Sequence, residues 1–209
     1  MTKTTLASVA MLALVATVAR GQETARVAVA PDSKIWIEGT SNLHSWSCKA
    51  TSLDANVEFD AAAAAQLAVA PPRALKRVTV KVPVKSLKCD HGGMDGNVYK
   101  ALKANESPEI SYILANFEVA AGEAKDNFNL KTVGTLTIAG KQQPLNMDVA
   151  ATRLADGTVK ATGVVTVKMT DFGIQPPTAI FGRLKTGNEV KVNFELNVGG
   201  KAIAAAVAP

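Results

Sequence analysis

The feature that most constrains this chain is a two-residue repeat of apolar side chains that recurs along most of its length. In the clearest run, 51–59, Leu53, Ala55, Val57 and Phe59 alternate with polar residues. This repeat is typical of a β-strand with one buried and one solvated face. Seven more segments show it: 34–39, 78–84, 110–119, 128–139, 145–154, 159–169 and 190–198. The sequence therefore predicts an all-β fold with eight strands.

The connections between these segments favour antiparallel neighbours. Asp156-Gly157 and Ala139-Gly140-Lys141 lie between adjacent apolar runs and are typical of tight hairpin turns. Eight one-faced strands can form two stacked sheets or one closed sheet. Because several segments reach ten or more residues, we favour an up-and-down barrel, which has no unpaired edge.

The side chains expected to face inward are mostly small. They are Val, Ala, Leu and Gly, and the whole chain has only six Phe, two Trp and two Tyr. An eight-stranded barrel either fills its interior with side chains or encloses one small ligand. The small lining favours an open lumen for an apolar ligand, and a packed barrel without a ligand is the alternative.

Three segments interrupt or flank the strand pattern. Residues 60–67 are rich in alanine, with Asp60 as a candidate N-cap. In 94–104 the apolar residues Met94, Val98, Ala101 and Leu102 have helical spacing. The sequence thus predicts one or two short helices. We expect the unpatterned tail 199–209 to be disordered.

The first 21 residues resemble a secretory signal peptide. Lys3 precedes an apolar run over 6–19, and small residues allow cleavage after Ala19 or Gly21. The run is shorter than the ~20 residues that span a bilayer, and no cysteine follows it to accept a lipid. We therefore expect an exported chain with one domain over 22–198.

The charge pattern argues against a nucleic-acid partner. The 23 Lys and Arg exceed the 18 Asp and Glu, but they are scattered singly, and aromatic residues make up only 5%. Enzymatic patterns are missing too: the sequence has no G-x-S-x-G setting and no glycine loop that would cradle a phosphate. We expect no enzyme activity and no catalytic residue.

The two cysteines, Cys48 and Cys89, lie 41 positions apart. In an exported chain a disulfide is the default interpretation. His44 and His91 accompany them as His44-x3-Cys48 and Cys89-x-His91, which makes four residues of the types that bind zinc. Because neither half has the usual ligand spacing, a metal site and free thiols are the less favoured alternatives.

Several motifs together resemble the YceI-like family of lipid- and polyisoprenoid-binding proteins. The resemblance runs over about 32–198 and is carried by segments 41–48, 82–87, 94–103, 107–110, 134–140 and 170–174. It implies a lipocalin-like, eight-stranded antiparallel β-barrel in the periplasm. It also implies a bound polyisoprenoid or similar amphiphilic lipid, such as an isoprenoid quinone or a fatty amide. Ser107 departs from the family pattern, which more often has Tyr before the proline.

Candidate ligand-binding residues come from these motifs and from the alternation. His44 and Trp46 suit a headgroup and its first apolar segment near a barrel mouth, although both are also typical core residues. The full set is His44, Trp46, Met94, Tyr99, Leu102, Phe117, Met147, Phe172 and Ile174. We expect Asp95 and Asp171 to cap turns rather than to perform chemistry.

The leading hypothesis is thus a periplasmic carrier with a lipid ligand and no other cofactor or metal. Transient membrane contact and a homodimer are compatible with it. One alternative is a metal- or haem-associated redox accessory protein that uses His44, His91 and the cysteines. Another is a structural stress-response module without a ligand.

Overall fold

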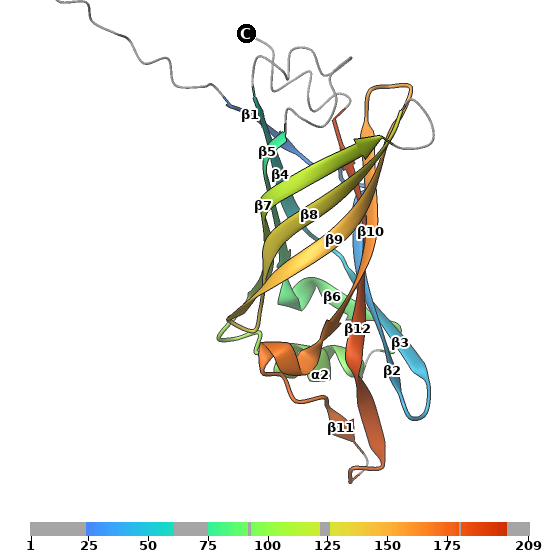
Figure 1. The fold of residues 1–209 in the computed structure, drawn as a ribbon. Coiled ribbons are helices and arrows are strands. Elements are labelled where there is room, and N and C mark those ends of the chain that lie inside the picture. The colour runs from blue at the N-terminus through green and yellow to red at the C-terminus, as the bar shows by residue number, and fades with distance from the viewer. Residues whose placement is uncertain (1–23, 61–74, 92, 122–125, 180, 200–209) are drawn as a thin grey trace, which may run out of the picture.

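The computed structural model describes residues 24–60, 75–91, 93–121, 126–179 and 181–199. These ranges are almost entirely β-sheet, with one α-helix (Figure 1), so the all-β prediction is confirmed. The strands are β1 (Thr24–Ala28), β2 (Lys34–Ser41), β3 (Ser45–Ala50), β4 (Asp54–Asp60), β5 (Leu75–Pro83), β6 (Leu87–Cys89), β7 (Glu109–Ala121), β8 (Asn127–Ile138), β9 (Lys141–Arg153), β10 (Val159–Lys168), β11 (Thr178–Ala179) and β12 (Leu184–Val198). The helical elements are α2 (Met94–Ala101) and the short 3-10 turns η2 (Val84–Ser86) and η3 (Met169–Phe172).

The strands form one antiparallel sheet that curls into a half-barrel. Its order is β1-β4-β5-β7-β8-β9-β10-β12-β2-β3-β6, with β11 paired to β12 outside this path. A bridge between Val29 and Val198 joins the β1 end of the sheet to β12. Beside it, the Ala30 N–H donates to the Asn197 carbonyl at 2.7 Å. One face of the sheet therefore encloses an interior, and the other faces outward.

The predicted count of eight strands is not confirmed, because eleven strands follow one another in the described sheet. The eight predicted segments overlap β2, β4, β5, β7, β8, β9, β10 and β12, although several of these strands extend beyond the predicted bounds. The strands that the pattern missed are β1, β3, β6 and β11, with five, six, three and two residues. Runs this short do not make a two-residue repeat stand out.

The predicted turn at Ala139-Gly140-Lys141 is present at its first two residues, and Lys141 already begins β9. Ile138 pairs with Lys141, and both turn residues have positive φ, at 50° and 77°. Positive φ at both positions is the geometry of the hairpin turn that matches strand twist. At Asp156-Gly157, Gly157 has φ 83° and completes the turn between β9 and β10. The four strands from β7 to β10 thus form a continuous antiparallel meander.

The predicted helix at 94–104 is present as α2 and ends at Ala101, three residues early. Lys103, with φ 53°, takes the chain out of the helix. The predicted signal peptide, the alanine-rich helix and the C-terminal tail lie outside the described residues, apart from Asp60, which ends β4, and Gly199. In the described ranges no helix has the length and hydropathy needed to span a membrane.

Buried apolar side chains gather at the two ends of the half-barrel rather than in one solid core. One cluster surrounds Val57 and Phe59 near β1. Two others lie at the end that holds α2, one around Leu136 and Phe172 and one around Trp46. Side chains of these clusters form part of the walls of the cavities described next.

Candidate ligand cavity

The interior holds two adjoining cavities of about 240 and 410 Å³. We call them the upper and the lower cavity; the lower one lies at the α2 end (Figure 1). Both are lined by the same five aliphatic residues, which we call the waist: Ile35, Val82, Ile110, Leu136 and Val192. Ligand sites in proteins are commonly ~300–1,000 Å³. The two cavities together therefore offer an elongated space on the scale of a small ligand.

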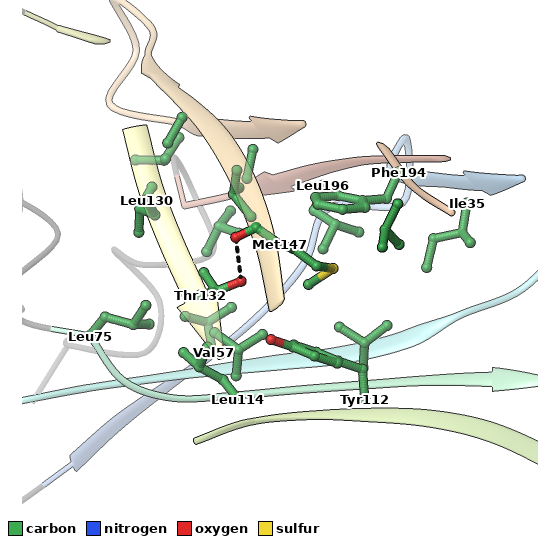
Figure 2. Close-up of a pocket in the computed structure, with 18 of the residues that line it drawn as sticks. Ile35, Val57, Leu75, Tyr112, Leu114, Leu130, Thr132, Met147, Phe194 and Leu196 are labelled. Atoms are coloured by element: carbon green, nitrogen blue, oxygen red, sulfur yellow. Dashed lines mark hydrogen bonds between the residues drawn. The ribbon is translucent and has the colours of Figure 1, made fainter. Parts of the chain in front are cut away.

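The upper cavity is almost wholly apolar. Side chains of β4, β5, β7, β8, β9, β10 and β12 converge on it (Figure 2), and only Tyr112, Thr132 and Arg153 bring polar side chains to its wall. This composition follows from the strand repeat, which sends every second, mainly aliphatic, residue inward. Among the residues at its far end, the Arg153 guanidinium lies 5.9 Å from the centre of the Phe128 ring.

Three aromatic rings lie flat against the inner wall because each covers a glycine on a neighbouring strand. The pairs are Trp46 over Gly39, Tyr112 over Gly134 and Phe194 over Gly163. A Cβ atom at these glycines would lie only 2.2, 2.4 and 2.5 Å from the nearest ring atom. The missing side chains thus let large rings lie along the wall and leave the lumen open.

The Tyr112 hydroxyl is a polar group buried in this apolar wall. Thr132 faces it but donates its own hydrogen to the Met147 carbonyl at 3.1 Å. The phenol oxygen has no hydrogen-bond partner among the described residues. Burial raises the pKa of Tyr112 above its ordinary 10.0, and Thr132 offsets this in part.

Tyr112→Phe is therefore expected to stabilise the protein by about 1 kcal/mol, because it removes a buried group that lacks a partner. Urea unfolding of the wild type and the variant measures this difference. A variant that is less stable than wild type by a similar amount would contradict the assignment, since it would mean that the hydroxyl has a stabilising partner.

The lower cavity is apolar near the waist and polar at its outer end. Its polar lining comes from the β2–β3 turn, from α2 with the loop before it, and from β11 and β12: Ser41, His44, His91, Asn97, Thr178 and Thr186. His44 and His91 are both exposed, and their rings stand almost perpendicular with centroids 5.7 Å apart. The lumen wall therefore changes from apolar in the upper cavity to partly polar at the outer end of the lower cavity.

The predicted disulfide is confirmed: Cys48 on β3 and Cys89 on β6 are register partners and are bonded to each other. Both sulfurs are thus unavailable as thiolate ligands, and the four-residue zinc arrangement does not form. Across the described part of the chain, no three His, Cys, Asp or Glu side chains gather as they would around a metal ion.

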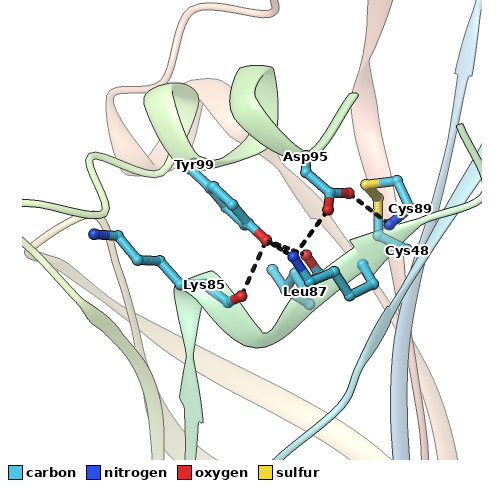
Figure 3. The surroundings of a disulfide bond; sticks show 7 residues. Cys48, Lys85, Leu87, Cys89, Asp95 and Tyr99 are labelled. Atoms are coloured by element: carbon cyan, nitrogen blue, oxygen red, sulfur yellow. Dashed lines mark hydrogen bonds and ion pairs between the residues drawn. A yellow bond between two sulfur atoms is a disulfide. The ribbon is translucent and has the colours of Figure 1, made fainter. Parts of the chain in front are cut away.

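A polar network beside the disulfide fastens α2 to the sheet (Figure 3). The Asp95 carboxylate accepts hydrogen bonds from the Cys89 N–H at 2.9 Å and from the Lys88 ammonium at 3.1 Å. The Tyr99 hydroxyl contacts the Lys85 and Leu87 carbonyls at 3.0 and 2.9 Å. The network sets the position of a helix that forms part of the lower cavity wall.

This network makes stability depend on pH through Asp95. The Cys89 N–H, and then Lys88, hold the pKa of Asp95 below its ordinary 3.8. A lowered folded-state pKa gives stability that is complete above 3.8 and is lost as the pH falls through the folded value.

Asp95→Asn should therefore unfold at a lower temperature than wild type at pH 7, and the gap should close as the pH falls below 3.8. Thermal unfolding followed by circular dichroism across this range measures it. Asp171→Asn is the control, because its carboxylate has no hydrogen-bond partner in the part of the chain that the structure describes. A gap that stays constant with pH would contradict the role of Asp95.

Most of the residues proposed from sequence lie at the lower cavity. Six line it: His44, Trp46, Met94, Leu102, Phe172 and Ile174. Met147 lines the upper cavity. The structure thus brings seven of the nine residues to the lumen wall, from four separate segments of the chain.

Tyr99 and Phe117 line neither cavity, contrary to the expectation. The Tyr99 hydroxyl faces the backbone between η2 and β6, where it serves as an anchor for α2. β7 lines the cavities only through Ile110, Tyr112 and Leu114, whereas Phe117 pairs with Thr132 beyond the register shift and is not itself a lining residue.

Sequence reasoning missed the waist, Tyr112 and the place of His91 in the wall. The waist residues Val82, Ile110 and Val192 are all in phase with their strand repeats, so the repeat itself was the available signal. Tyr112 shares that phase on β7. No spacing rule connects His91 to the lumen.

The curled antiparallel sheet around an apolar lumen defines a ligand-binding half-barrel. The chain matches the model of the YceI-like domain over residues 31–198, and it belongs to the YceI-like family. No curated protein matches the chain.

Solved structures share the fold at low sequence identity. A polyisoprenoid binding domain from Saccharophagus degradans, implicated in plant cell wall breakdown, is 12% identical with a TM-score of 0.63, covering 85% of this chain and 99% of that one. Burkholderia cenocepacia BcnA is 19% identical with a TM-score of 0.58, covering 79% and 95%. The Campylobacter jejuni YCEI protein is 19% identical with a TM-score of 0.52, covering 76% and 82%.

Proposed function

We propose that this protein is a carrier that holds a polyisoprenoid or similar amphiphilic lipid, such as an isoprenoid quinone or a fatty amide, in its lumen. The observation that carries the proposal is the pair of adjoining apolar cavities that meet at an aliphatic waist. Each methylene removed from water there contributes about 0.8 kcal/mol. Membership of the YceI-like family and the fold shared with a polyisoprenoid binding domain support the same class of ligand.

The polarity of the wall suggests how the lipid lies. Its hydrocarbon chain extends from the lower cavity across the waist into the upper cavity, where only three side chains are polar. Its headgroup lies at the outer end of the lower cavity, beside Ser41, His44 and His91. This orientation leaves the headgroup as the part that is nearest to water.

We further propose that the chain is exported and works in the periplasm as a lipocalin-like container without a catalytic step. The signal-like first 21 residues support export. The disulfide supports an oxidising compartment. Because both cysteines are joined, neither is available as a nucleophile, which favours binding over catalysis.

The proposal is tested by purifying the protein from its native host without detergent and recording native mass spectra. A mass increase of one lipid per chain, which organic extraction removes and identifies as an isoprenoid or long-chain amphiphile, is the expected result. A protein that is empty on purification, and that takes up no polyprenol, quinone or fatty amide in vitro, would overturn the proposal.

A further inference from the structure

The lower end of the molecule carries two apolar side chains that stand out in solvent. Leu43, in the β2–β3 turn, is 72% exposed, and Phe181, in the β11–β12 turn, is fully exposed at 108%. The other large apolar side chains on the described surface are less exposed and are spread over the outer wall and the turn after β9: Ile113, Val133, Leu154 and Val164. The two most exposed residues therefore lie at the same end as the polar mouth of the lumen.

The turn that displays Leu43 is held rigidly. The Ser41 hydroxyl accepts hydrogen bonds from the Leu43 and His44 N–H groups at 3.2 and 3.1 Å and donates to the His44 carbonyl at 2.8 Å. These bonds fix the backbone on both sides of Leu43. The ordered turn thus holds the Leu43 side chain in its exposed position.

The second turn is fastened to the first by Asn42. The Asn42 side chain donates to the Arg183 carbonyl at 2.8 Å and accepts from the Lys185 N–H at 2.9 Å. The Asn42 N–H also donates to the Lys185 carbonyl at 3.0 Å. Leu43 and Phe181 therefore project from two joined turns, which we call the apolar tips.

Phe181 adopts a backbone conformation that large side chains rarely take. Its φ is 53°, and the following Gly182 has φ 81°. A non-glycine residue in the left-handed region is uncommon, and such strain is typical of functional positions. An exposed phenylalanine held in this way needs a partner that accepts apolar side chains.

The charges around the tips point to an anionic partner. Arg183 and Lys185 are exposed beside Phe181, and segments 39–47 and 172–188 contain no Asp or Glu. Apolar side chains beside cations are typical of surfaces that enter the interface of a membrane containing anionic lipids. The tips also border the mouth, since Ser41, His44, Thr178 and Leu184 line the lower cavity.

We propose that the apolar tips dock this protein on an anionic lipid bilayer, with Leu43 and Phe181 entering the headgroup region and Arg183 and Lys185 contacting lipid phosphates. Docking brings the mouth of the lower cavity to the membrane surface, so a lipid passes between bilayer and lumen without crossing water. This inference rests on the proposed carrier function, because a carrier must meet the membrane from which it loads.

Cosedimentation with vesicles of phosphatidylethanolamine and phosphatidylglycerol tests the docking. Wild type is expected to bind, and the double variant Leu43→Ser/Phe181→Ser should bind about tenfold more weakly. The matched control is Ile113→Ser/Val164→Ser, which removes apolar side chains that are 43% and 60% exposed on the outer wall and should bind like wild type. Equal binding by the two double variants, or no binding by wild type, would overturn the proposal. Either result would indicate that the apolar tips contact a protein instead of a bilayer.

A second variant tests the charge and does not depend on the apolar substitutions. Arg183→Gln/Lys185→Gln should weaken binding to the anionic vesicles about fivefold or more at low salt, and added salt should erase the difference. Binding that is unchanged by these substitutions would overturn the anionic assignment.

Lipid uptake from dilute ethanol solution separates this proposal from the carrier function. The Leu43→Ser/Phe181→Ser variant should take up lipid from ethanol as wild type does but should acquire it from vesicles more slowly. Wild type that binds vesicles but takes up no lipid from either source would contradict the carrier function alone. Equal rates of acquisition from vesicles would contradict the docking alone.

Discussion

Gly134→Ala is expected to lower the affinity for lipid at least tenfold, or ~1.4 kcal/mol. The added Cβ would lie 2.4 Å from the Tyr112 ring, so the ring has to leave the wall. Strand β8 blocks the Tyr112 ring on one side, so the ring turns into the upper cavity, which offers only about 240 Å³. Overpacking of this kind also costs about 1–3 kcal/mol of stability. Titration of delipidated protein with a fluorescent fatty amide measures the affinity.

Two companion variants make the test of Gly134 specific. Tyr112→Leu in the Gly134→Ala background removes the ring and should restore most of the affinity. Gly96→Ala, in α2, has no atom within 4 Å of the new Cβ and should leave the affinity unchanged. Undiminished affinity in Gly134→Ala, or no recovery in the double variant, would contradict the role of the glycine.

Loss of the disulfide is expected to lower the free energy of unfolding by about 4 kcal/mol in the chain-entropy model. The bond joins residues 41 positions apart, so the unfolded chain is strongly constrained when the bond is intact. Alanine is the better replacement at both positions, because Cys48 is fully buried and a hydroxyl there would lack a partner. Urea unfolding of Cys48→Ala/Cys89→Ala and wild type gives the difference.

The same loss should loosen α2, because the Cys89 N–H anchors Asp95. We therefore expect faster amide exchange over 94–101 in the double alanine variant, while the meander from β7 to β10 keeps its protection. Reduction of wild type should reproduce both effects. A change below 1 kcal/mol with unchanged exchange in α2 would show that β3 and β6 hold together without the covalent bond.

The sequence predicted much of the fold because its dominant signal is local. The repeat in 51–59 is visible without knowing any neighbour, since a strand with one buried face selects apolar residues at every second position. The same holds for the turn at Ala139-Gly140, whose residues identify the hairpin directly. α2 was located from the spacing of Met94 and Val98.

Features that depend on register could not be predicted from the sequence. Gly134 lies under Tyr112 only because β7 and β8 pair with Leu114 opposite Gly134. No sequence pattern in β7 or β8 predicts that pairing. Phe117 is a second case: it pairs with Thr132, which lines the upper cavity, but the strand pattern does not say which residues of that face reach the cavity.

The joined tips also depend on contacts between distant segments. Asn42 and Arg183 are 141 positions apart, so their hydrogen bond appears only in the folded chain. His44 and His91 are a similar case: with the two cysteines they left a metal site open as an alternative, but folding places them in the wall of an apolar cavity. The chemistry of a side chain was readable in the sequence, whereas its surroundings required the structure.

The most direct test of a lipid within the lumen uses the two tryptophans. Trp46 lines the lower cavity, whereas Trp36 does not line either cavity and donates to Glu38. In Trp36→Phe, the remaining tryptophan reports on the lumen alone. A brominated fatty amide should quench its fluorescence with one-to-one stoichiometry, and the same lipid without bromine should not. Stoichiometric binding of the brominated lipid that leaves Trp46 unquenched would place the lipid elsewhere and contradict the account.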